Sequence, residues 1–178
     1  MYNPVGVKIP LSAILFAISP CMQAELGWVN LHLKATIIDT GCTVSTNSLS
    51  KIVEMGELAT KQLKNNGGRG PLIPFTLNLE DCTEKAMDVN IKFSGIADSI
   101  DSTLLSLDKG SNTAQNVAIE ILDKDQKKIS LGQVSSNYKT TDDNVIYAMN
   151  FYAQYVATRQ NVIPGNAESK ATFTLSYD

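Results

Sequence analysis

The chain has 178 residues, of which 43% are hydrophobic and 19% are charged, so it is long enough and apolar enough to fold as one ordinary domain. Its formal net charge is −3, and Arg69 and Arg159 are its two arginines, which excludes a basic surface for a nucleic-acid backbone. Around the one histidine, His32, no nucleophile–base pair can be assembled. We therefore expect no enzyme activity, no cofactor, no nucleic-acid partner and no small-molecule substrate.

Residues 1–24 have the pattern of a secretory signal peptide, in which a basic residue precedes an apolar run over residues 9–18. Ten residues at about 1.5 Å each do not span a hydrocarbon core of about 30 Å, so this run predicts no membrane anchor. A buried core helix and a lipoprotein signal at Cys21 are the less favoured alternatives. We expect export and cleavage at the end of this segment, which leaves a mature chain of residues 25–178.

Cleavage also accounts for the odd number of cysteines. It removes Cys21 and leaves Cys42 and Cys82, and two cysteines in an exported chain are expected to pair. The disulfide would close a loop of about 40 residues, for which chain entropy predicts a stabilisation of roughly 4 kcal/mol. A free thiol nucleophile or a metal-binding pair is the weaker alternative, because the chain has neither a CxxC motif nor a second histidine.

Apolar and polar residues alternate along most of the mature chain, which is typical of half-buried β-strands. The first such run places five apolar side chains on one face, namely Val29, Leu31, Leu33, Ala35 and Ile37. Further runs cover residues 75–79, 89–93, 117–121, 145–157 and 171–177. Residues 57–64 favour a short helix, and turns rich in Gly, Asn and Asp separate the runs. The pattern predicts an all-β fold, an immunoglobulin-like sandwich in one domain.

Three segments match ligand-binding motifs only in part. Residues 65–71 are glycine-rich but lack the ending of a phosphate-binding loop. Asp123 begins a calcium-like pattern that Lys127 interrupts, and residues 142–143 are adjacent carboxylates that would point apart on a strand. We interpret all three as surface turns, and the sequence predicts no metal site.

Several segments of the mature chain together carry the residue pattern of a known family. They are the Cys42-Thr-Val motif, the run Phe75–Asp81 before the second cysteine, and the runs Val89–Asp98, Asn150–Thr158 and Ala171–Tyr177. In this combination the chain resembles the subunits of chaperone–usher fimbriae. Two details, Ala97-Asp98 followed by Leu104-Leu105 and Ala59–Leu63 before the glycine-rich loop, are most similar to the minor tip-fibrillum subunits of type 1 fimbriae.

The resemblance implies an incomplete immunoglobulin-like sandwich that lacks its last strand and has an apolar groove along one edge. It implies that residues 25–38 form an N-terminal donor strand for a neighbouring subunit and that residues 39–178 form the pilin domain. The donor side chains would be those of the first alternating run, in which Ala35 stands where family members typically carry glycine. The chaperone-binding and groove-lining strand would contain Ala171, Phe173, Leu175, Tyr177 and Asp178, the last with its terminal carboxylate held by the chaperone.

We therefore expect a structural, non-enzymatic subunit that polymerises by donor-strand exchange, an adaptor near the tip of a fimbrium that contributes to cell adhesion. The expected partners are a periplasmic chaperone, an outer-membrane usher and the neighbouring fimbrial subunits. The expected location is the extracellular fimbrium, reached through the periplasm. Two alternatives stay open: a major rod subunit, and a self-contained periplasmic immunoglobulin-like binding module in which residues 29–37 form the first strand of their own sheet.

Overall fold

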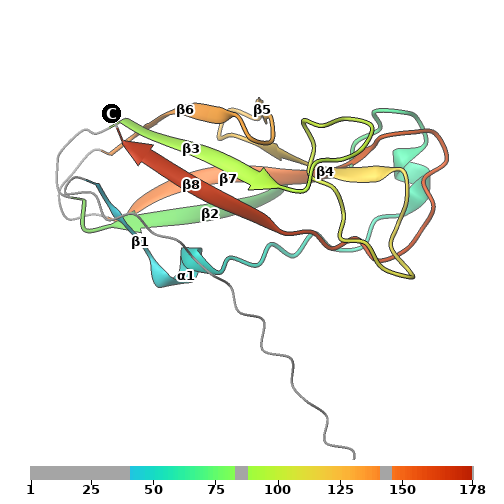
Figure 1. The fold of residues 1–178 in the computed structure, drawn as a ribbon, viewed down its shortest axis with the longest axis horizontal. Helices are drawn as coiled ribbons and strands as arrows, with labels where there is room; N and C mark the ends of the chain where they lie inside the picture. Colours follow the sequence, from blue (N-terminus) through green and yellow to red (C-terminus); the bar gives the residue numbers. More distant parts are fainter. Residues whose placement is uncertain (1–40, 83–87, 141–145, 178) are drawn as a thin grey trace, which may run out of the picture. The chain divides into compact units, whose positions relative to one another are not determined.

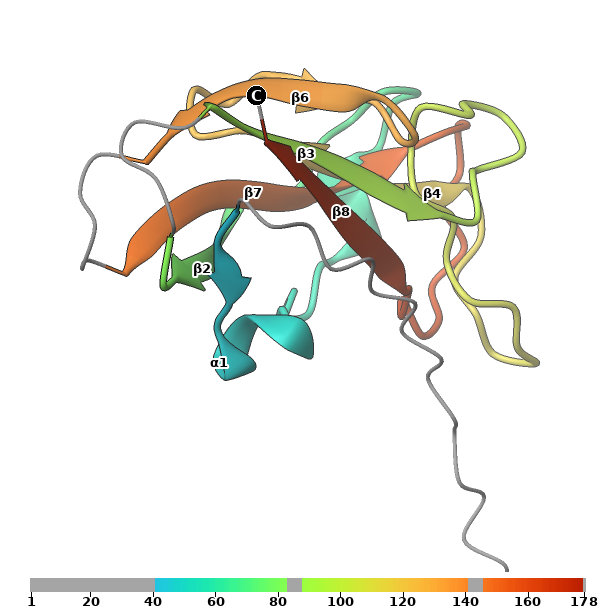
Figure 2. The same ribbon diagram turned by 60° about the vertical axis from the view of Figure 1, so that its left-hand side comes forward.

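The computed structural model describes residues 41–82, 88–140 and 146–177, whose strands form two antiparallel sheets. The first sheet contains β1 (Thr43–Val44), β2 (Ile73–Glu80), β7 (Tyr147–Ala157), β4 (Val117–Leu122) and β5 (Lys128–Ile129), in that spatial order. The second contains β6 (Val134–Lys139), β3 (Asp88–Gly95) and β8 (Ala171–Tyr177). In Figures 1 and 2 the second sheet lies over β2 and β7 as a separate layer. The prediction of an all-β sandwich is confirmed.

The alternating runs form strands because every second side chain enters a shared core. Val89 and Ile91 of β3 are fully buried, as are Leu77 of β2 and Phe151 of β7, and all belong to one cluster between the sheets. The Phe151 ring lies at the centre of this cluster. Its centroid is 5.4 Å from that of Phe75, 5.3 Å from that of Phe93 and 5.2 Å from that of Tyr138.

A second apolar cluster lies beside the first and is covered by the chain that precedes β2. This cluster contains Leu63, Leu105, Leu107, Val117, Ile119, Ala153, Tyr155 and Ala157. The predicted helix over residues 57–64 is largely wrong, because only Thr60–Leu63 form a helical turn, of the 3-10 type. Ala59 is extended, and Leu58 packs on the cluster and fills the space beside Gly70, so core burial overrides the local helix preference.

The connection between the sheets closes one side of the sandwich. Residues 130–133 join β5 to β6, with the Leu131 amide donating to the Thr103 carbonyl at 3.0 Å and the Gly132 amide donating to the Phe93 carbonyl at 2.7 Å. The Leu131 side chain packs against both apolar clusters. Since β5 and β6 share this closed side, β1 and β8 are the edge strands of the opposite side.

Some predictions fall on residues outside the described ranges. They concern the signal peptide, His32, the donor strand with Val29, Leu31, Leu33, Ala35 and Ile37, the adjacent carboxylates at 142–143, and Asp178. The calcium-like segment lies in a described turn, in which the Asp123 carboxylate accepts from the amides of Asp125 and Lys127, both at 2.8 Å. Within the described ranges, no helix has the length and apolarity that a bilayer crossing requires.

Candidate functional site

The last strand, β8, is paired along one side. Its partner is β3, in an antiparallel register that runs from Val89 opposite Tyr177 to Gly95 opposite Ala171. Among the residues that the structure describes, no strand pairs with the other side of β8. An edge strand of this kind presents a row of free N–H and C=O groups, which another strand can pair with.

The side chains of β8 alternate between the core and solvent. Phe173, Leu175 and Tyr177 are half-buried and pack against the main apolar cluster, whereas the residues between them are exposed. Ala171, which the sequence places on the same face, is exposed at the start of the strand. The structure thus brings three of the five predicted groove residues into one apolar row along an open edge.

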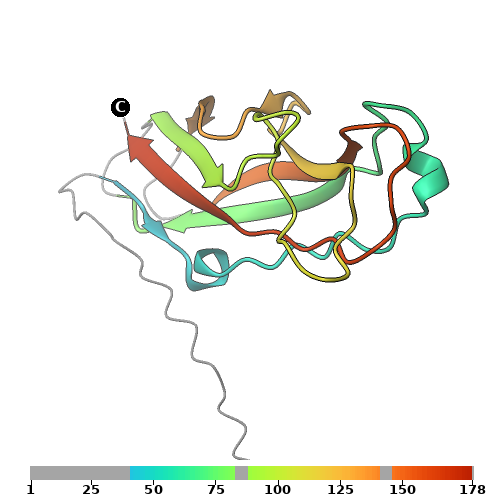
Figure 3. The ribbon, with the colours of Figure 1, turned by 45° about the vertical axis from the view of Figure 1, so that its right-hand side comes forward.

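Across from β8, the first sheet ends in a strand of two residues. β1 pairs with β2 only at Thr43–Glu80 and Val44–Leu79, and the chain then turns through α1 (Thr46–Leu49) into an extended segment (Figure 3). Met55 and Leu58 of that segment are half-buried against the second cluster. The sequence pattern does not identify these two residues as part of the site, because their run is too short to give a clear alternation.

Phe75 marks the place where the core is incompletely covered. Its ring stacks on Phe151 and meets Phe93 edge to face with the centroids 6.3 Å apart. Phe93 and Phe151 are buried, but Phe75 keeps part of its surface accessible although it contacts both clusters. The open side therefore combines the edge of β8, which no strand in the described part of the chain pairs with, and accessible apolar surface. Together they suit an extended, apolar-alternating segment.

A disulfide and a tyrosine fix one end of the open side. The predicted Cys42–Cys82 pair is confirmed, with its sulfur atoms 2.08 Å apart, and it links the chain before β1 to the end of β2. The Tyr177 hydroxyl donates to the Cys42 carbonyl at 3.0 Å. This bond joins the last residue of β8 to the chain that enters β1, so it spans from one sheet to the other.

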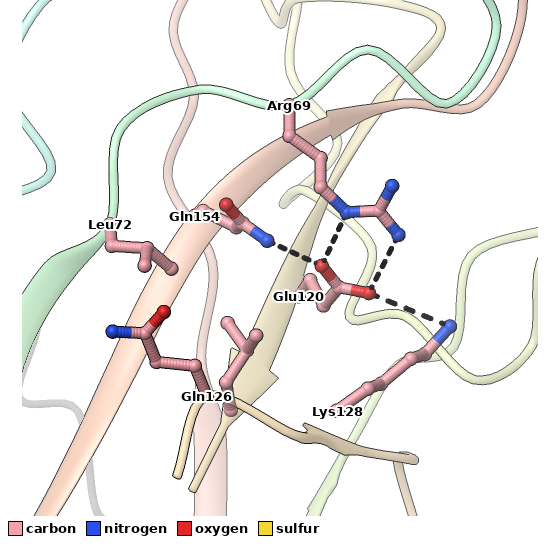
Figure 4. A pocket seen from close by; sticks show the side chains of 7 residues that line it. Arg69, Leu72, Glu120, Gln126, Lys128 and Gln154 are labelled. Carbon is pink, nitrogen blue, oxygen red and sulfur yellow. Dashed lines mark hydrogen bonds and ion pairs between the residues drawn. The ribbon is translucent and has the colours of Figure 1, made fainter. Parts of the chain in front are cut away.

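A second candidate site is a shallow pocket of about 290 Å³ on the outer face of the first sheet, centred on Glu120 (Figure 4). The Glu120 side chain is 2% exposed. Its carboxylate accepts from Arg69 Nε at 3.0 Å, from Arg69 Nη2 at 3.3 Å and from Gln154 Nε2 at 2.6 Å, and Lys128 Nζ lies 3.9 Å away. Burial alone would raise the pKa of Glu120, but these hydrogen bonds and the charges of Arg69 and Lys128 outweigh it and lower that pKa.

The Glu120 cluster has the properties of a network of ion pairs and hydrogen bonds that stabilises the fold. The carboxylate is ionised and already occupied by three side chains, so it offers neither a base nor a free ligand for a substrate. Within the described ranges, no three His, Cys, Asp or Glu side chains are grouped so that they could hold a metal ion. Arg69 precedes β2, whereas Glu120 and Gln154 lie on β4 and β7, so the cluster holds three parts of the first sheet together.

Replacing Glu120 with glutamine is expected to lower the free energy of unfolding by about 1–3 kcal/mol at neutral pH. Because the folded-state pKa of Glu120 is lowered, its contribution is complete above the pKa of the unfolded chain, about 4.3, and is lost as the pH falls through the folded-state value. The difference between wild type and variant should therefore shrink below about pH 4. Urea denaturation at several pH values measures this difference in the free energy of unfolding.

Asp125→Asn is the matched control, since it removes an exposed carboxylate that is paired with the exposed Lys124. We expect this variant to follow the wild type at all pH values, because exposed ion pairs contribute little. A Glu120→Gln difference that stayed constant down to acidic pH would contradict the assignment of an ionised, stabilising carboxylate.

The sandwich, its Cys42–Cys82 disulfide and its C-terminal edge strand define a pilin-type subunit. The chain belongs to the fimbrial protein family, whose model matches residues 31–178. It is 36% identical over 174 residues to the fimbrial-like protein FimF of Salmonella typhimurium, covering 97% of each chain.

Solved structures agree with this assignment. An antigen and type I fimbria protein of Burkholderia pseudomallei, 27% identical, superposes with a TM-score of 0.60 over 79% of this chain and 91% of its own. A subunit in a chaperone–usher pilus structure, 18% identical, shares the fold with a TM-score of 0.61 over 88% of this chain and 99% of its own. The chain is therefore a structural fimbrial subunit and not an enzyme. A fimbrial subunit acts in an extracellular fibre, where it contacts other subunits.

Proposed function

We propose that this subunit polymerises by donor-strand exchange, accepting a strand along the open side of β8 and donating residues 25–38 to the next subunit. The observation that carries the proposal is the edge of β8 that no strand of the described ranges pairs with, along which Phe173, Leu175 and Tyr177 are half-buried. Strand addition to such an edge supplies main-chain hydrogen bonds, while pockets for alternate side chains supply specificity.

The proposed donor segment matches these requirements in its sequence. Its apolar positions recur at every second residue from Val29 to Ile37, so one face of an extended strand is apolar. Burial of five such side chains contributes roughly 5–12 kcal/mol before the cost of ordering the segment. The small Ala35 suits a narrow position in the partner, although it is larger than glycine.

Before assembly, an exposed apolar edge would promote aggregation, so we propose that a periplasmic chaperone occupies it first. In this proposal the chaperone pairs with β8, and its basic residues hold the terminal carboxylate of Asp178. An outer-membrane usher then brings subunits together, and the donor strand of the neighbouring subunit replaces the chaperone. The subunit reaches the fimbrium by export through the periplasm, after removal of residues 1–24.

Within the fimbrium, we propose an adaptor position near the tip, from which the subunit contributes to cell adhesion. Support comes from the segment Ala97–Leu105, whose sequence resembles that of the minor tip-fibrillum subunits of type 1 fimbriae. Ala97 and Leu105 form a β-bridge, and the Asp98 amide donates to the Leu104 carbonyl at 3.0 Å. Leu104 and Leu105 are buried, so this segment is an integral part of the domain.

Immunogold labelling of isolated fimbriae tests the adaptor position. We expect label at the tips and none along the shafts, because an adaptor is present in few copies. Continuous labelling of the shafts would show that the chain is a major rod subunit, the alternative role.

Leu33→Asp tests donation directly, since it places a charge on the apolar face of the proposed donor strand. We expect loss of subunit–subunit association, measured by size-exclusion chromatography of chaperone–subunit mixtures, because burial of an unpaired carboxylate is strongly unfavourable. Asn30→Asp is the matched control on the polar face and should associate as the wild type does. Equal association of Leu33→Asp and wild type would contradict donation by residues 25–38.

A further inference from the structure

We propose that Ser48 and Pro74 determine which sheet edge accepts an incoming strand, by closing the edge of β2 so that the strand is added to β8. This inference rests on the proposed strand-accepting role of the open side and adds to it the residues that select the edge. An extended segment that enters the open side meets two edges. One is β8, and the other is the part of β2 that the two-residue β1 leaves uncovered.

The first observation is the direction of the backbone groups of β2. The Asn78 carbonyl accepts from the Ser45 amide at 3.0 Å, on the side of β2 that faces away from β7. In an antiparallel sheet, the N–H and C=O groups of every second residue point to the same side of the strand. Those of Thr76 and Pro74 therefore also face away from β7, and a strand added to β2 would have to pair with them.

The second observation is that a proline stands at one of these positions. Proline has no N–H, so at Pro74 the edge of β2 offers a carbonyl but no donor. Pro74 lies opposite Tyr152 of β7, but its nitrogen faces the uncovered side, so the sheet itself loses no hydrogen bond. Prolines at such positions are a known means by which an edge strand avoids pairing with another strand.

The third observation concerns the other end of the uncovered part of β2. The Asn78 amide donates to the Ser48 hydroxyl at 2.7 Å. The Ser45 carbonyl, which would accept this amide in a regular ladder, instead accepts from the amides of Ser48 and Leu49 at 2.8 and 3.2 Å. Ser48 is 1% exposed, and its hydroxyl also forms a hydrogen bond with that of Ser45 at 3.0 Å. Thus α1 ends the β1–β2 ladder and occupies the amide from which a new ladder would continue.

The fourth observation is the contrast with β8. Residues 171–177 contain neither a proline nor a charged side chain, and β8 pairs with β3 along its whole length, so its other edge is that of a regular strand. On β2, Thr76 lies between a position without a donor and a position whose amide is already bonded. Because a stable ladder needs several successive positions, an incoming strand forms more hydrogen bonds on β8.

Hydrogen–deuterium exchange of the mature chain, residues 25–178, tests the inference when it is followed by NMR with and without a synthetic peptide of residues 25–38. In the wild type, we expect the peptide to slow exchange in β8 by about tenfold or more and to leave exchange of the Thr76 amide unchanged. In Pro74→Thr, which restores the missing donor, the peptide should slow exchange at Thr76 as well. Pro164→Thr is the matched control, because Pro164 is exposed and lies outside the strands, and it should behave as the wild type does.

A second variant combines Pro74→Thr with Ser48→Ala, which also frees the Asn78 amide. In this double variant, protection by the peptide should extend from Thr76 to Asn78. Protection of Thr76 in the wild type would overturn the inference, because the edge of β2 would then be open. Protection confined to β8 in both variants would also overturn it, because Ser48 and Pro74 would then not be the residues that close this edge.

The same experiment separates failure of the inference from failure of the proposed function. If the peptide protected no amide of β8 in the wild type or in any variant, the strand-accepting role of β8 would be contradicted, and with it the selection between the two edges. Protection of β8 together with an unselective β2 edge would contradict the roles of Ser48 and Pro74 alone.

Discussion

Replacement of Phe151 with alanine is expected to lower the free energy of unfolding by about 4 kcal/mol. Phe151 is fully buried and contacts the rings of Phe75, Phe93 and Tyr138, so its loss leaves a cavity between the two sheets. Those three rings come from both sheets and are held by β-pairing, so they are poorly placed to fill the cavity. Urea denaturation of the variant and the wild type measures the difference.

Tyr152→Ala provides the control on the same strand. Tyr152 follows Phe151, points to the opposite face of β7 and is only half-buried, so we expect a much smaller loss of stability. Equal losses for the two variants would mean that the aromatic cluster is not the centre of the fold. A much larger loss for Phe151→Ala is the result that the structure predicts.

Removal of the disulfide is expected to have an effect of similar size. Replacing both Cys42 and Cys82 with serine releases a loop with a sequence separation of 40, and chain entropy predicts a loss of roughly 4 kcal/mol. The double replacement avoids leaving a free thiol. Thermal unfolding under oxidising conditions compares the variant with the wild type.

Chemical reduction of the wild type serves as the matched control for this variant. Reduced wild type and the double serine variant should unfold alike, because both lack the same cross-link. An oxidised wild type no more stable than the variant would contradict the stabilising role of the disulfide.

The alternating pattern predicted the long strands well because in each of them every second side chain enters the core; in β4 the side chains between them are buried as well. Residues 75–79, 89–93, 117–121 and 171–177 lie within β2, β3, β4 and β8, and the alternating burial of β3 and β8 follows the predicted pattern. Successive side chains of a β-strand point to opposite faces, whatever the neighbouring strands are. These strands can therefore be recognised from the sequence without knowledge of their partners.

Strand β6 was missed because its pattern is irregular. The pairing of β3 with β6 shifts register between Val89 and Ile91, which indicates a β-bulge. As a result Ser135 and Tyr138, three positions apart, are both buried, whereas Val134 is 59% exposed. A bulge breaks the alternation on which prediction from sequence depends.

The two candidate sites differ in how far they can be predicted from the sequence. The row of Phe173 and Leu175 on β8 is a local pattern, so the sequence predicted it. The Glu120 cluster depends on Arg69, which is 51 residues away, and Glu120 itself lies in an apolar run with no sign of its partner. The contact of Tyr177 with Cys42 is equally non-local and became apparent only in the folded structure.

Deletion of residues 25–38 tests the central claim most directly, through measurement of chaperone binding and polymerisation of the remaining chain. The proposed role predicts that residues 39–178 still bind the periplasmic chaperone and accept a donor strand from intact subunits, but do not polymerise with one another. A truncated chain that loses its fold and its chaperone binding would contradict this role. The first alternating run would then be part of the sheet of a self-contained domain.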